Sequence, residues 1–599
     1  MVYIYLRNKI LSYHIIKSKT KYSLIVTRFN TEVLKQKKVL LLSEWCRSFD
    51  LDKRFLEKTS LARPYGCNLS QKNIDFTFGR FLEKKLLNEL GVILNRYHKK
   101  NFSKRFWTII LGHWLRRFVD VSINRVKSIQ MCAKDYNITS LFIYKNQDYL
   151  IPTNSLSAIH MFNNDYFNSF LYLNAFKALN KKINVSYLSN NIKNINKKIL
   201  KQPQNCIKKY IYYLAHIYHK YIVRYINHSL IINSYLPRNV EILLNLKLKQ
   251  LPVFSLFTEF QYDKPDIKLR NELKSGLNKS TQNPVERFIR EHIFDCMPQS
   301  YLENFQSLDK CIKDRGWPEN PKIIFTSNNF DTDDAFKKYA AENAERGSKY
   351  ICAAHGAYGV WRHHMRNTPE ETTPDKFISW GSLKINKNYV PGFVLKYPKS
   401  ARLKNDKGKY LLFVLRSHEN RIFSWDESFE YKKYFLDQLK FVKKLKYRPN
   451  AMLRLRKSSG QSDLYFGEQE IWQKLKNKIK YDKNRKITKS YQTAKIVVFT
   501  YDSSGILETL SANIPTLAFW QNGFEHLRES AKPYYKLLVD AGIVHLSAES
   551  VAKKVNEVWN DVHEWWGQSK IQRARVKFCE RYARLSENPS HDIIKIFSS

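Results

Sequence analysis

The chain has 599 residues, of which 43% are hydrophobic and 14% aromatic, and this composition excludes a generally disordered protein. Its longest apolar runs, TIILGHWL (108–115) and YLLFVL (410–415), are much shorter than the roughly 20 residues of a membrane span, and the first residues lack the pattern of a signal peptide. The eight cysteines form no CxxC pair, which argues against a zinc site or a disulfide framework and favours a reduced, cytoplasmic protein.

The formal net charge is +48, from 102 Lys and Arg against 54 Asp and Glu. An imbalance of this size predicts attraction to polyanions such as nucleic acid, anionic lipid or nucleotide-linked substrates. The basic residues are spread along the whole chain, however, and many stand beside Asn, Ile and Tyr, as in residues 190–200 and 208–226. A genome rich in A/T codons would produce the same mixture, so both explanations of the charge stay open.

The first third of the chain is dense in aromatic and apolar residues. Residues 37–46 (KKVLLLSEWC) predict a buried strand and a turn, and the apolar spacing within 74–98 predicts an amphipathic helix. Residues 106–129 predict a second helix, for which a break near Gly112 is an open alternative. Residues 150–250 are polar and nearly free of Gly, which predicts helices and long loops.

From about residue 318, strand-like and helix-like segments alternate. The predicted strands lie within 321–328, 349–359, 409–417, 450–456, 495–505 and 514–520. Acidic residues at its start and Gly347 at its end predict a capped helix over 331–347. This alternation predicts an α/β fold with parallel, doubly wound sheets, in which ligands bind at the carboxyl ends of the strands.

The sharpest candidate site follows the apolar strand within 495–505. There Asp502, Ser503, Ser504 and Gly505 form a turn, and a helix begins at once. Ser and Gly at a helix start leave backbone N–H groups free to face an anion, and the helix dipole assists. The alternative is that Asp502 or a serine simply caps the helix, and spacing alone does not decide between the two.

A second candidate is His355, which follows the strand predicted within 349–359. It stands in the segment Ala-His-Gly-Ala-Tyr-Gly (354–359), where Gly356 allows close approach of a substrate to the backbone and Tyr358 follows. A histidine in this position fits a general base. The alternative is a surface or packing histidine.

Three arginines form a third group of candidates. Arg454 and Arg456 alternate along a predicted strand and so lie on one face of it, where they are able to bind a diphosphate. Arg416 stands at the end of another predicted strand. The alternative is that all three are solvated basic residues at strand ends.

A fourth group lies in the aromatic N-terminal region and comprises Glu44, Trp45 and Arg105. Aromatic side chains at this density usually pack in a core, whereas Glu44, a carboxylate directly after a buried strand, needs a partner. Dinucleotide, phosphate-loop, metalloprotease and hydrolase motifs are absent, and no DxD metal motif stands out. The acidic run 331–334 fits a helix start better than a metal site, so we expect no metal and no other cofactor.

Eight separated segments stand out together: LLLSEWCRSF (40–49), NRYHKKNFSKRFWTIILGHWL (95–115), MPQSYLENF (297–305), WPENPKIIFTSNNF (317–330), AAHGAYG (353–359), DKFISWG (375–381), TYDSSGILETLSANIPTLAFW (500–520) and EWWGQ (564–568). In this order they resemble a family of transferases of bacterial O-antigen and related surface-polysaccharide biosynthesis. The resemblance covers about 38–130 and 290–570. The His-Gly and Asp-Ser-Ser elements also look like those of the CDP-glycerol glycerophosphotransferases of teichoic acid synthesis.

The resemblance implies a GT-B-like fold, in which two Rossmann-like domains face a cleft. An N-terminal extension (1–37) would precede an acceptor domain (38–396) with a helical insertion at about 150–250, and a nucleotide-donor domain (397–599) would follow. The boundary is expected near 395–408.

The resemblance also implies a reaction, in which a sugar passes from a nucleotide-linked donor to a hydroxyl of a polysaccharide or lipopolysaccharide precursor. His355 becomes a base or phosphate ligand, and Ser503, Ser504 and Glu508 line the donor site. The full expected donor set is Arg416, Arg454, Arg456, Asp502, Ser503, Ser504, Gly505 and Glu508, and Glu44, Trp45, Arg105, Gly356 and Tyr358 are expected on the acceptor side or in a structural role. Such enzymes need no metal when cationic side chains and helix N-termini neutralise the leaving phosphate. The expected partners are the nucleotide-sugar donor, a glycan or lipid-linked acceptor and the anionic inner face of the cell membrane, with no nucleic acid.

Two other classes of function remain as alternatives. The net charge suggests a protein that binds nucleic acid or another polyanion, although no nucleic-acid motif accompanies it. Departures from the family pattern suggest a catalytically inactive, scaffold-like relative. They occur at Ala354 and Ala357 in the His-Gly element, at the order Tyr501-Asp502, and at residues 454–457.

Overall fold

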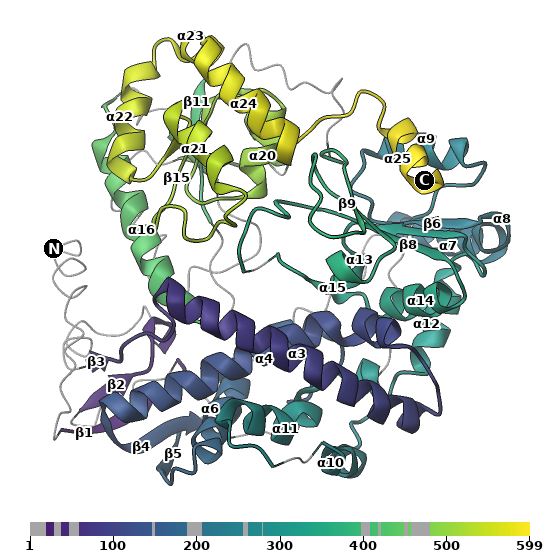
Figure 1. Cartoon of the computed structure of the whole chain (residues 1–599), viewed down its shortest axis with the longest axis vertical. Helices are drawn as coiled ribbons and strands as arrows, with labels where there is room; N and C mark the ends of the chain where they lie inside the picture. Colours follow the sequence, from purple (N-terminus) through teal and green to yellow (C-terminus); the bar gives the residue numbers. More distant parts are fainter. Residues whose placement is uncertain are drawn as a thin grey trace.

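The computed structural model describes residues 20–28, 38–46, 59–145, 150–188, 206–254, 262–277, 280–363, 365–396, 408–416, 421–447, 453–456, 472, 480–484 and 486–599. Three β-sheets lie in these residues, and all strand pairs within them are parallel. The predicted α/β class with parallel sheets is therefore confirmed. Figure 1 shows the first sheet at the lower left, the second at the right and the third at the top, with α3 and α4 crossing between them.

The first sheet has the strand order β3-β2-β1-β4-β5, which is that of a Rossmann-like sheet. Its strands are β1 (Lys21–Ile25), β2 (Val39–Leu41), β3 (Thr59–Leu61), β4 (Asn137–Tyr144) and β5 (Asn184–Leu188). The helical segments of this part are η2 (Glu44–Cys46), α3 (Leu69–His98), α4 (Lys104–Asp135), α5 (Ser155–Phe162) and α6 (Asp165–Ala178).

Both long helices begin where the sequence supplies a cap. The Asn68 side chain accepts from the N–H of Gln71 at the start of α3, and Ser103 caps α4 in the same way. α4 runs unbroken through Gly112, so the alternative of a break there is wrong. A Cβ at Gly112 would lie 2.6 Å from Pro369, so the glycine instead allows the close approach of a neighbouring segment.

The second sheet has its strands in chain order, β10-β9-β8-β7-β6. They are β6 (Ser229–Ile231), β7 (Ile323–Thr326), β8 (Lys349–Ala353), β9 (Lys376–Ile378) and β10 (Tyr389–Val390). The helical segments in this stretch of the chain are α7 (Cys206–Tyr218), η3 (His219–Val223), α8 (Arg224–Ile226), α9 (Arg238–Lys247), α10 (Ile267–Ser275), α11 (Pro284–Cys296), η4 (Gln299–Tyr301), α12 (Ser307–Arg315), α13 (Asn329–Thr332), α14 (Asp334–Glu345) and α15 (Pro369–Thr372). Of these, α11 packs on α4 and α6 of the first part, and α10 packs on α11 (Figure 1). As expected for the acidic run 331–334, Asp333 caps α14.

The third sheet has the order β13-β12-β11-β14-β15-β16, the full doubly wound arrangement of a Rossmann fold. Its strands are β11 (Tyr410–Val414), β12 (Leu453–Arg456), β13 (Lys480–Tyr481), β14 (Ala494–Phe499), β15 (Thr516–Phe519) and β16 (Val544–His545). The helices are α16 (Glu427–Lys444), α19 (Ile487–Thr493), α20 (Ser504–Ser511), α21 (Lys532–Asp540), α22 (Ala548–Val558), α23 (Val562–Gly567), α24 (Ser569–Tyr582) and α25 (Pro589–Ser598).

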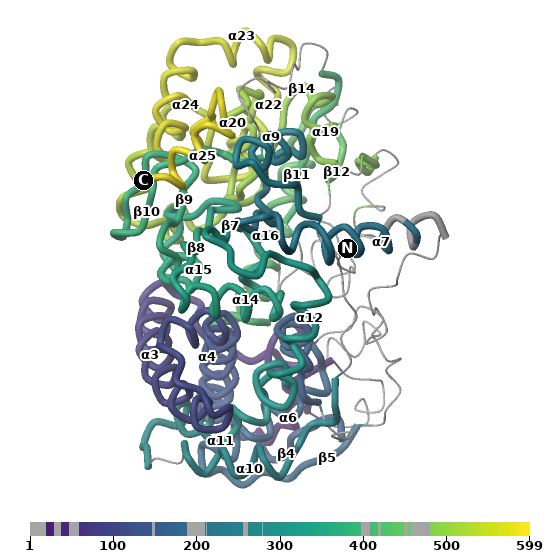
Figure 2. Tube along the Cα trace, turned by 90° about the vertical axis from the view of Figure 1, so that its right-hand side faces the viewer, coloured from purple at the N-terminus to yellow at the C-terminus, as the bar shows by residue number. Residues whose placement is uncertain are grey.

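The final helix, α25, leaves the third sheet and packs on the second. Ile593, Ile596 and Phe597 of α25 share one buried apolar cluster with residues of α9 and of the second sheet. Figure 1 shows α25 beside α9, and Figure 2 shows the same neighbours from the side. α25 therefore connects the part of the chain that forms the third sheet to the part that forms the second sheet.

The domain boundaries differ from those expected at three places. β1 is the central strand of the first sheet, so that sheet begins before residue 38. The zone 150–250 contains β5 and β6, which belong to two different sheets, in addition to helices. α25 packs outside the third sheet although it falls within 397–599. The strands β1, β5 and β6 are three to five residues long, and apolar runs this short give little periodic signal in the sequence. Most of the boundary expected at 395–408 lies outside the described residues.

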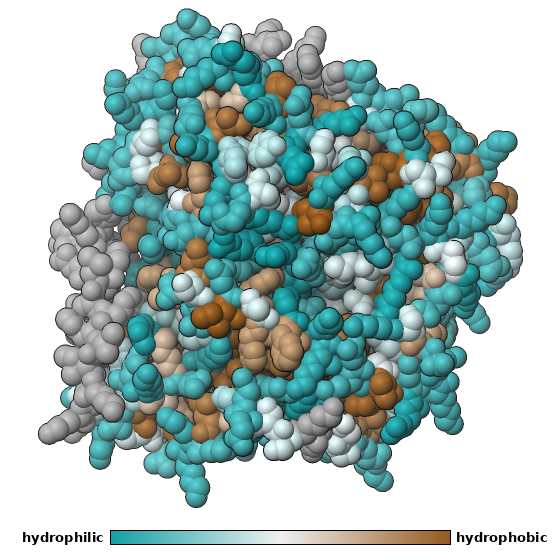
Figure 3. Space-filling model, in the orientation of Figure 1, coloured by the Kyte–Doolittle hydropathy of each residue, from teal (hydrophilic) through white to brown (hydrophobic). Residues whose placement is uncertain are grey.

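The face drawn in Figure 3 is largely hydrophilic, with apolar side chains in small separate groups. The buried apolar side chains form one large cluster that includes residues of all three sheets, together with the smaller α25 cluster. The three sheets are thus packed into one body, which holds the loops at their strand ends in fixed contact.

Candidate functional site

The loop after β8 and the first turn of α20 touch each other. The N–H of Ala357 donates to Ser504 Oγ at 3.2 Å. A Cβ at Gly356 would overlap that same oxygen, so the loop approaches α20 this closely because residue 356 is a glycine. Two sequence elements 147 residues apart therefore meet at one place, which we call the seam.

Lys396 and Glu508 form an ion pair at the seam. Lys396 Nζ lies 2.8 Å from Glu508 Oε1 on α20, and the lysine also lies 5.3 Å from the centre of the Tyr235 ring. The Tyr235 ring centre lies 6.0 Å from that of His355. A cation, a histidine and a helix N-terminus are thus gathered where the second and third sheets meet.

His355 is held by a chain of buried groups behind it. Burial and the nearby Lys396 charge lower the pKa of His355, and Asp331 and the Ser327 carbonyl oppose this shift only in part, so the ring is neutral at pH 7. Tyr358 donates to Glu370 Oε1 at 2.8 Å, and its hydroxyl oxygen lies 3.1 Å from His355 Nδ1. With the hydroxyl proton directed to Glu370, that oxygen is an acceptor that faces Nδ1 of His355.

Glu370 is itself an unusual carboxyl group. Burial, reinforced by the neighbouring Glu371 charge, raises the pKa of Glu370 to about 7. Its second oxygen lies 3.2 Å from Nε2 of His113 on α4. Burial lowers the pKa of His113 to about 3, so this histidine stays neutral.

The Asp-Ser-Ser-Gly turn has more than one role. Asp502 accepts from Trp361 Nε1 at 3.0 Å, from the Tyr535 hydroxyl at 2.8 Å and from His526 Nε2 at 2.9 Å. It therefore anchors Trp361, which follows the His355 loop, and its carboxylate oxygens are already engaged by these three donors. A Cβ at Gly505 would lie 2.5 Å from Phe499, so this glycine permits packing of α20 on its own strand.

Ser503 precedes α20 but its hydroxyl does not cap the helix. The Ser503 side chain is buried, and its hydroxyl interacts with the side chain of Tyr501. The alternative that a serine or Asp502 simply caps this helix therefore loses its basis. The N–H groups of the first turn of α20 are left without a side-chain acceptor from the cap.

A pocket of about 400 Å³ adjoins the turn, at the carboxyl ends of β11, β14 and β15. Residues of all three parts of the molecule line it: Leu69, Lys72, Trp361, His363, Met365, Arg416, Phe423, Trp425, Glu427, Glu430, Tyr434, Asp437, Gln438, Thr500, Tyr501, Asp502, Phe519, Trp520, Gln521, Asn522, Glu525 and His526. The many aromatic rings suit the flat faces of a base or a sugar. In doubly wound sheets, ligands bind at the carboxyl ends of the strands, which is where this pocket lies.

The three candidate arginines are not brought together. Arg416 lines the pocket and pairs with Glu427. Arg454 packs its guanidinium 4.2 Å from the ring centre of Tyr410, and Arg456 pairs with Asp482 at 2.8 Å. Neither of these two lines the pocket. Their expected place in the donor set stays a prediction that the geometry does not favour.

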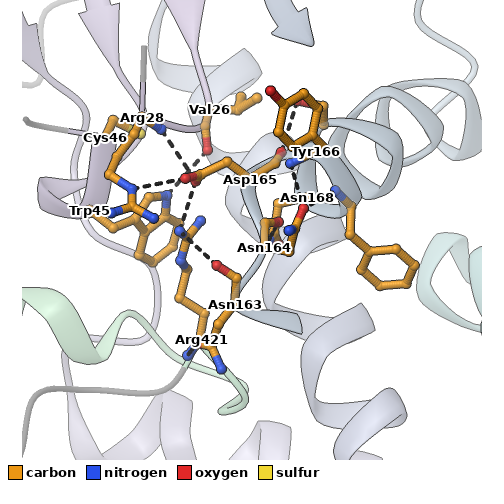
Figure 4. Close-up of polar contacts among 12 residues, drawn as sticks. Val26, Arg28, Trp45, Cys46, Asn163, Asn164, Asp165, Tyr166, Asn168 and Arg421 are labelled. Carbon is orange, nitrogen blue, oxygen red and sulfur yellow. Dashed lines mark hydrogen bonds and ion pairs between the residues drawn. The ribbon is translucent and has the colours of Figure 1, made fainter. Parts of the chain in front are cut away.

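Glu44 and Trp45 lie at the contact between the first and third sheets. Lys432 of α16 pairs with Glu44 at 2.6 Å, which supplies the partner that this buried carboxylate needs. Trp45 donates to the carbonyl of Val26 at 3.2 Å and packs 5.7 Å from the Arg421 guanidinium. Figure 4 shows Trp45 and Arg421 next to each other beside Asp165. We interpret both residues as structural.

Arg105 is also structural. Its Nε donates to the carbonyl of Thr373 at 2.8 Å, and its Nη2 pairs with Asp375 at 2.9 Å. It thus fastens the start of α4 to the segment before β9 and does not reach the seam.

The seam contains important residues that the sequence did not reveal. Lys396 stands just before the expected domain boundary with no motif around it, and Glu370 lies in the polar segment that forms the short helix α15. Trp361 comes two residues after the Gly-containing loop 354–359, and this short sequence distance was the one feature that could have indicated its place near the seam. Among the described residues, no cluster of three or more His, Cys, Asp or Glu is able to hold a metal ion, and none of the described helices combines the length and apolarity of a membrane span.

The strand order, the contact between the two loops and the adjoining pocket define a multi-sheet α/β protein with a pocket at the carboxyl edge of a Rossmann-like sheet. The chain belongs to the LIC12162 family of transferases, whose family model matches residues 22–597. No curated protein matches the sequence.

Several solved structures are distantly similar. MurG from Acinetobacter baumannii is 12% identical, with a TM-score of 0.29, and the match covers 59% of this chain and 86% of MurG. S. aureus MnaA with UDP is 12% identical, with a TM-score of 0.34 and coverage of 62% and 95%. An O-GlcNAc transferase from Thermobaculum terrenum is 9% identical, with a TM-score of 0.32 and coverage of 82% and 90%. Likeness at this level leaves the substrate of this chain undefined.

Proposed function

We propose that this chain is a GT-B-type glycosyltransferase, which transfers a sugar from a nucleotide-linked donor to a hydroxyl group of a surface-polysaccharide precursor. The observation that carries the proposal is the contact between Ala357 and Ser504, because it joins a histidine loop to a helix N-terminus beside an aromatic pocket. Each part alone has an ordinary structural explanation. Their convergence at a strand edge of a Rossmann-like sheet, in a member of a transferase family, favours group transfer from a phosphate-linked donor.

The donor phosphates are proposed to lie at the first turn of α20. The uncapped N–H groups there, the partial positive charge of the helix end and the Lys396 ammonium group all favour an anion. The Ser503 hydroxyl, which does not cap the helix and lies beside Tyr501, adds a hydrogen-bonding group next to this turn. The aromatic pocket next to this turn then takes a ring of the donor, either the base or the sugar.

His355 is proposed as the general base. Its lowered pKa keeps the imidazole unprotonated at neutral pH, as a base requires. The acceptor hydroxyl gives its proton to the unprotonated ring nitrogen of His355 while its oxygen bonds to the anomeric carbon. The bond from that carbon to the phosphate oxygen breaks, and the electron pair leaves with the phosphate, where Lys396 and the end of α20 stabilise the charge. Atoms and charge balance without a metal or another cofactor.

The acceptor is proposed to be a glycan or lipid-linked precursor at the cytoplasmic face of the cell membrane. The net charge of +48 supports this placement because it attracts the protein to an anionic surface.

The test begins with a panel of CMP-, UDP-, GDP- and CDP-linked sugars. With the donor that stabilises the protein, His355→Ala should keep the fold and donor binding but lower turnover by about 10²- to 10⁴-fold. Transfer at the wild-type rate by purified His355→Ala would refute the role of this histidine. A panel in which no donor binds at millimolar concentration would instead favour a scaffold or polyanion-binding protein.

A further inference from the structure

The helix formed by α7, η3 and α8 exposes a continuous apolar stripe. Its members are Tyr210, Tyr213, Leu214, Ile217, Tyr221 and Tyr225, which recur every three or four residues and therefore lie on one face. They are 37–68% exposed. Of the twenty large apolar side chains that are exposed in the described part of the chain, eight lie between 210 and 226. Such concentration exceeds the scattered exposure that is normal for a protein surface.

The opposite face of this helix is anchored to the protein. His219 is buried, contacts the carbonyl of Arg315 at 3.0 Å through Nδ1 and accepts from the N–H of Phe254 at 3.0 Å through Nε2. Val223 is buried beside it, and the Tyr218 hydroxyl donates to the carbonyl of Pro252 at 3.0 Å. Figure 2 shows α7 extending away from the body of the molecule. The stripe is thus held in a fixed orientation and points outward.

The chain segment that carries the stripe is basic. The sequence contains no Asp or Glu from residue 166 to residue 240, but twelve Lys and Arg. Exposed Lys220 lies 5.3 Å from the ring centre of Tyr221, and Arg224 lies 5.7 Å from that of Tyr225. Among the described residues of this helix, Arg224 forms an ion pair with Glu319. Basic side chains stand beside the aromatic rings and are able to extend past them.

We propose that this stripe docks the protein on an anionic membrane surface, with the helix lying in the plane of the interface. An apolar face rich in Tyr and bordered by Lys and Arg matches the boundary between lipid headgroups and acyl chains, where Tyr is enriched. The local absence of acidic residues matches anionic headgroups better than a protein surface. The inference rests on the proposed function only in that a lipid-linked acceptor would be met at this surface.

The position of the helix links docking to the seam. α8 is followed directly by β6, a strand of three residues or about 10 Å. The chain after β6 carries Tyr235, which lies beside His355. The docking element and the site are therefore connected through one short strand of the second sheet.

The experiment is co-sedimentation of the full-length protein with vesicles of phosphatidylcholine alone or mixed with an equal part of phosphatidylglycerol. The wild-type protein should bind the mixed vesicles, and binding should weaken in high salt. The triple variant Tyr213→Gln, Tyr221→Gln and Tyr225→Gln should lose about tenfold or more of this binding. The double variant Ile74→Gln and Phe81→Gln is the matched control, because these side chains of α3 are exposed by 58% and 62%.

Three results would overturn the proposal. They are undiminished binding by the triple variant, equal losses in the triple variant and the control, and no binding of the wild-type protein to mixed vesicles. In the last case, light scattering that shows a dimer in the wild type and a monomer in the triple variant would assign the stripe to self-association. Vesicle binding needs no donor, so its failure leaves the donor measurements unaffected and the two proposals are separable.

Discussion

Replacing Arg421 with Met should destabilise the contact between the first and third sheets. Arg421 is 3% exposed, and its guanidinium lies 2.8 Å from Asp165 Oδ1. Arg28, which is 18% exposed, contacts the other carboxylate oxygen at 2.8 Å. Figure 4 shows both arginines directed at Asp165. Burial acts to raise the pKa of Asp165, but the charges of Arg421 and Arg28 outweigh it and hold the pKa below its usual value.

The expected cost follows from this geometry. Removing one partner of a buried ion pair leaves an uncompensated charge and costs about 3–5 kcal/mol. Arg28 remains beside Asp165 after the change, so the lower end, about 3 kcal/mol, applies to Arg421→Met. When Asp165→Asn is added, the deeply buried carboxylate charge is gone and the charge that remains is Arg28, which is 18% exposed, so the double variant should be less destabilised than the sum of the two single variants by about 2 kcal/mol.

The assay is urea unfolding of the wild type, both single variants and the double variant, followed by tryptophan fluorescence. Arg346→Met is the control, because Arg346 is 62% exposed and its change should alter the free energy of unfolding by less than about 0.5 kcal/mol. A loss below about 1 kcal/mol for Arg421→Met, or strictly additive effects in the cycle, would refute the account of Asp165 as a buried clamp between the sheets.

Two further predictions concern the seam. Gly356→Ala should cost about 1 kcal/mol of unfolding free energy, because the new Cβ displaces the Ser504 hydroxyl from the N–H of Ala357; in a Ser504→Ala background the same change should cost little, and equal costs in both backgrounds would contradict the contact. The pKa of Glu370, about 7, lies above that of an exposed Glu, so the stability linked to its proton is fully present below about pH 4.5 and is lost as the pH rises through 7. Glu370→Gln should abolish this loss and gain up to about 3 kcal/mol relative to wild type at pH 8.5, but not at pH 4.5; parallel stability profiles of the two proteins in urea titrations would be inconsistent with a neutral Glu370.

Much of the local structure could be predicted because its signals are local. Apolar spacing located α3 and α4, and the acidic start at Asp333 located α14. The strands β7, β8, β11, β12 and β15 lie within the predicted segments, and β14 begins one residue before its predicted segment. Because parallel strands end at the same edge of a sheet, the sequence also predicted that the polar residues after these strands would gather at that edge.

The features that were missed depend on contacts between distant parts of the chain. No local pattern marks β1 as the central strand of a sheet, because a five-residue strand gives too little periodicity. α25 packs on α9 and the second sheet through apolar side chains, and no local sequence pattern indicates which apolar surface a helix will cover. Lys396 becomes part of the seam only through its pair with Glu508, 112 residues away. Arg454 and Arg456 were expected near the donor because they alternate on one strand, but Tyr410 and Asp482 occupy them instead.

The role of Asp502 also required the structure. Sequence spacing placed it in a turn after β14, where phosphate binding and helix capping were both open. The folded chain gives it three hydrogen-bond donors, including Trp361 from the second sheet. The residue at the centre of the sequence motif is therefore an anchor between sheets, and its neighbours Ser503 and Ser504 face the seam.

The most direct test of the central claim is the affinity of the stabilising nucleotide-sugar for wild-type protein and for Lys396→Met, measured by titration calorimetry. If the donor phosphates lie at the first turn of α20, loss of the ammonium group should weaken binding about ten- to a hundredfold. Lys387→Met, which changes an exposed lysine of the same sheet region, should bind as the wild type does. Equal donor affinity in all three proteins would contradict the assignment of the seam as the donor-phosphate site.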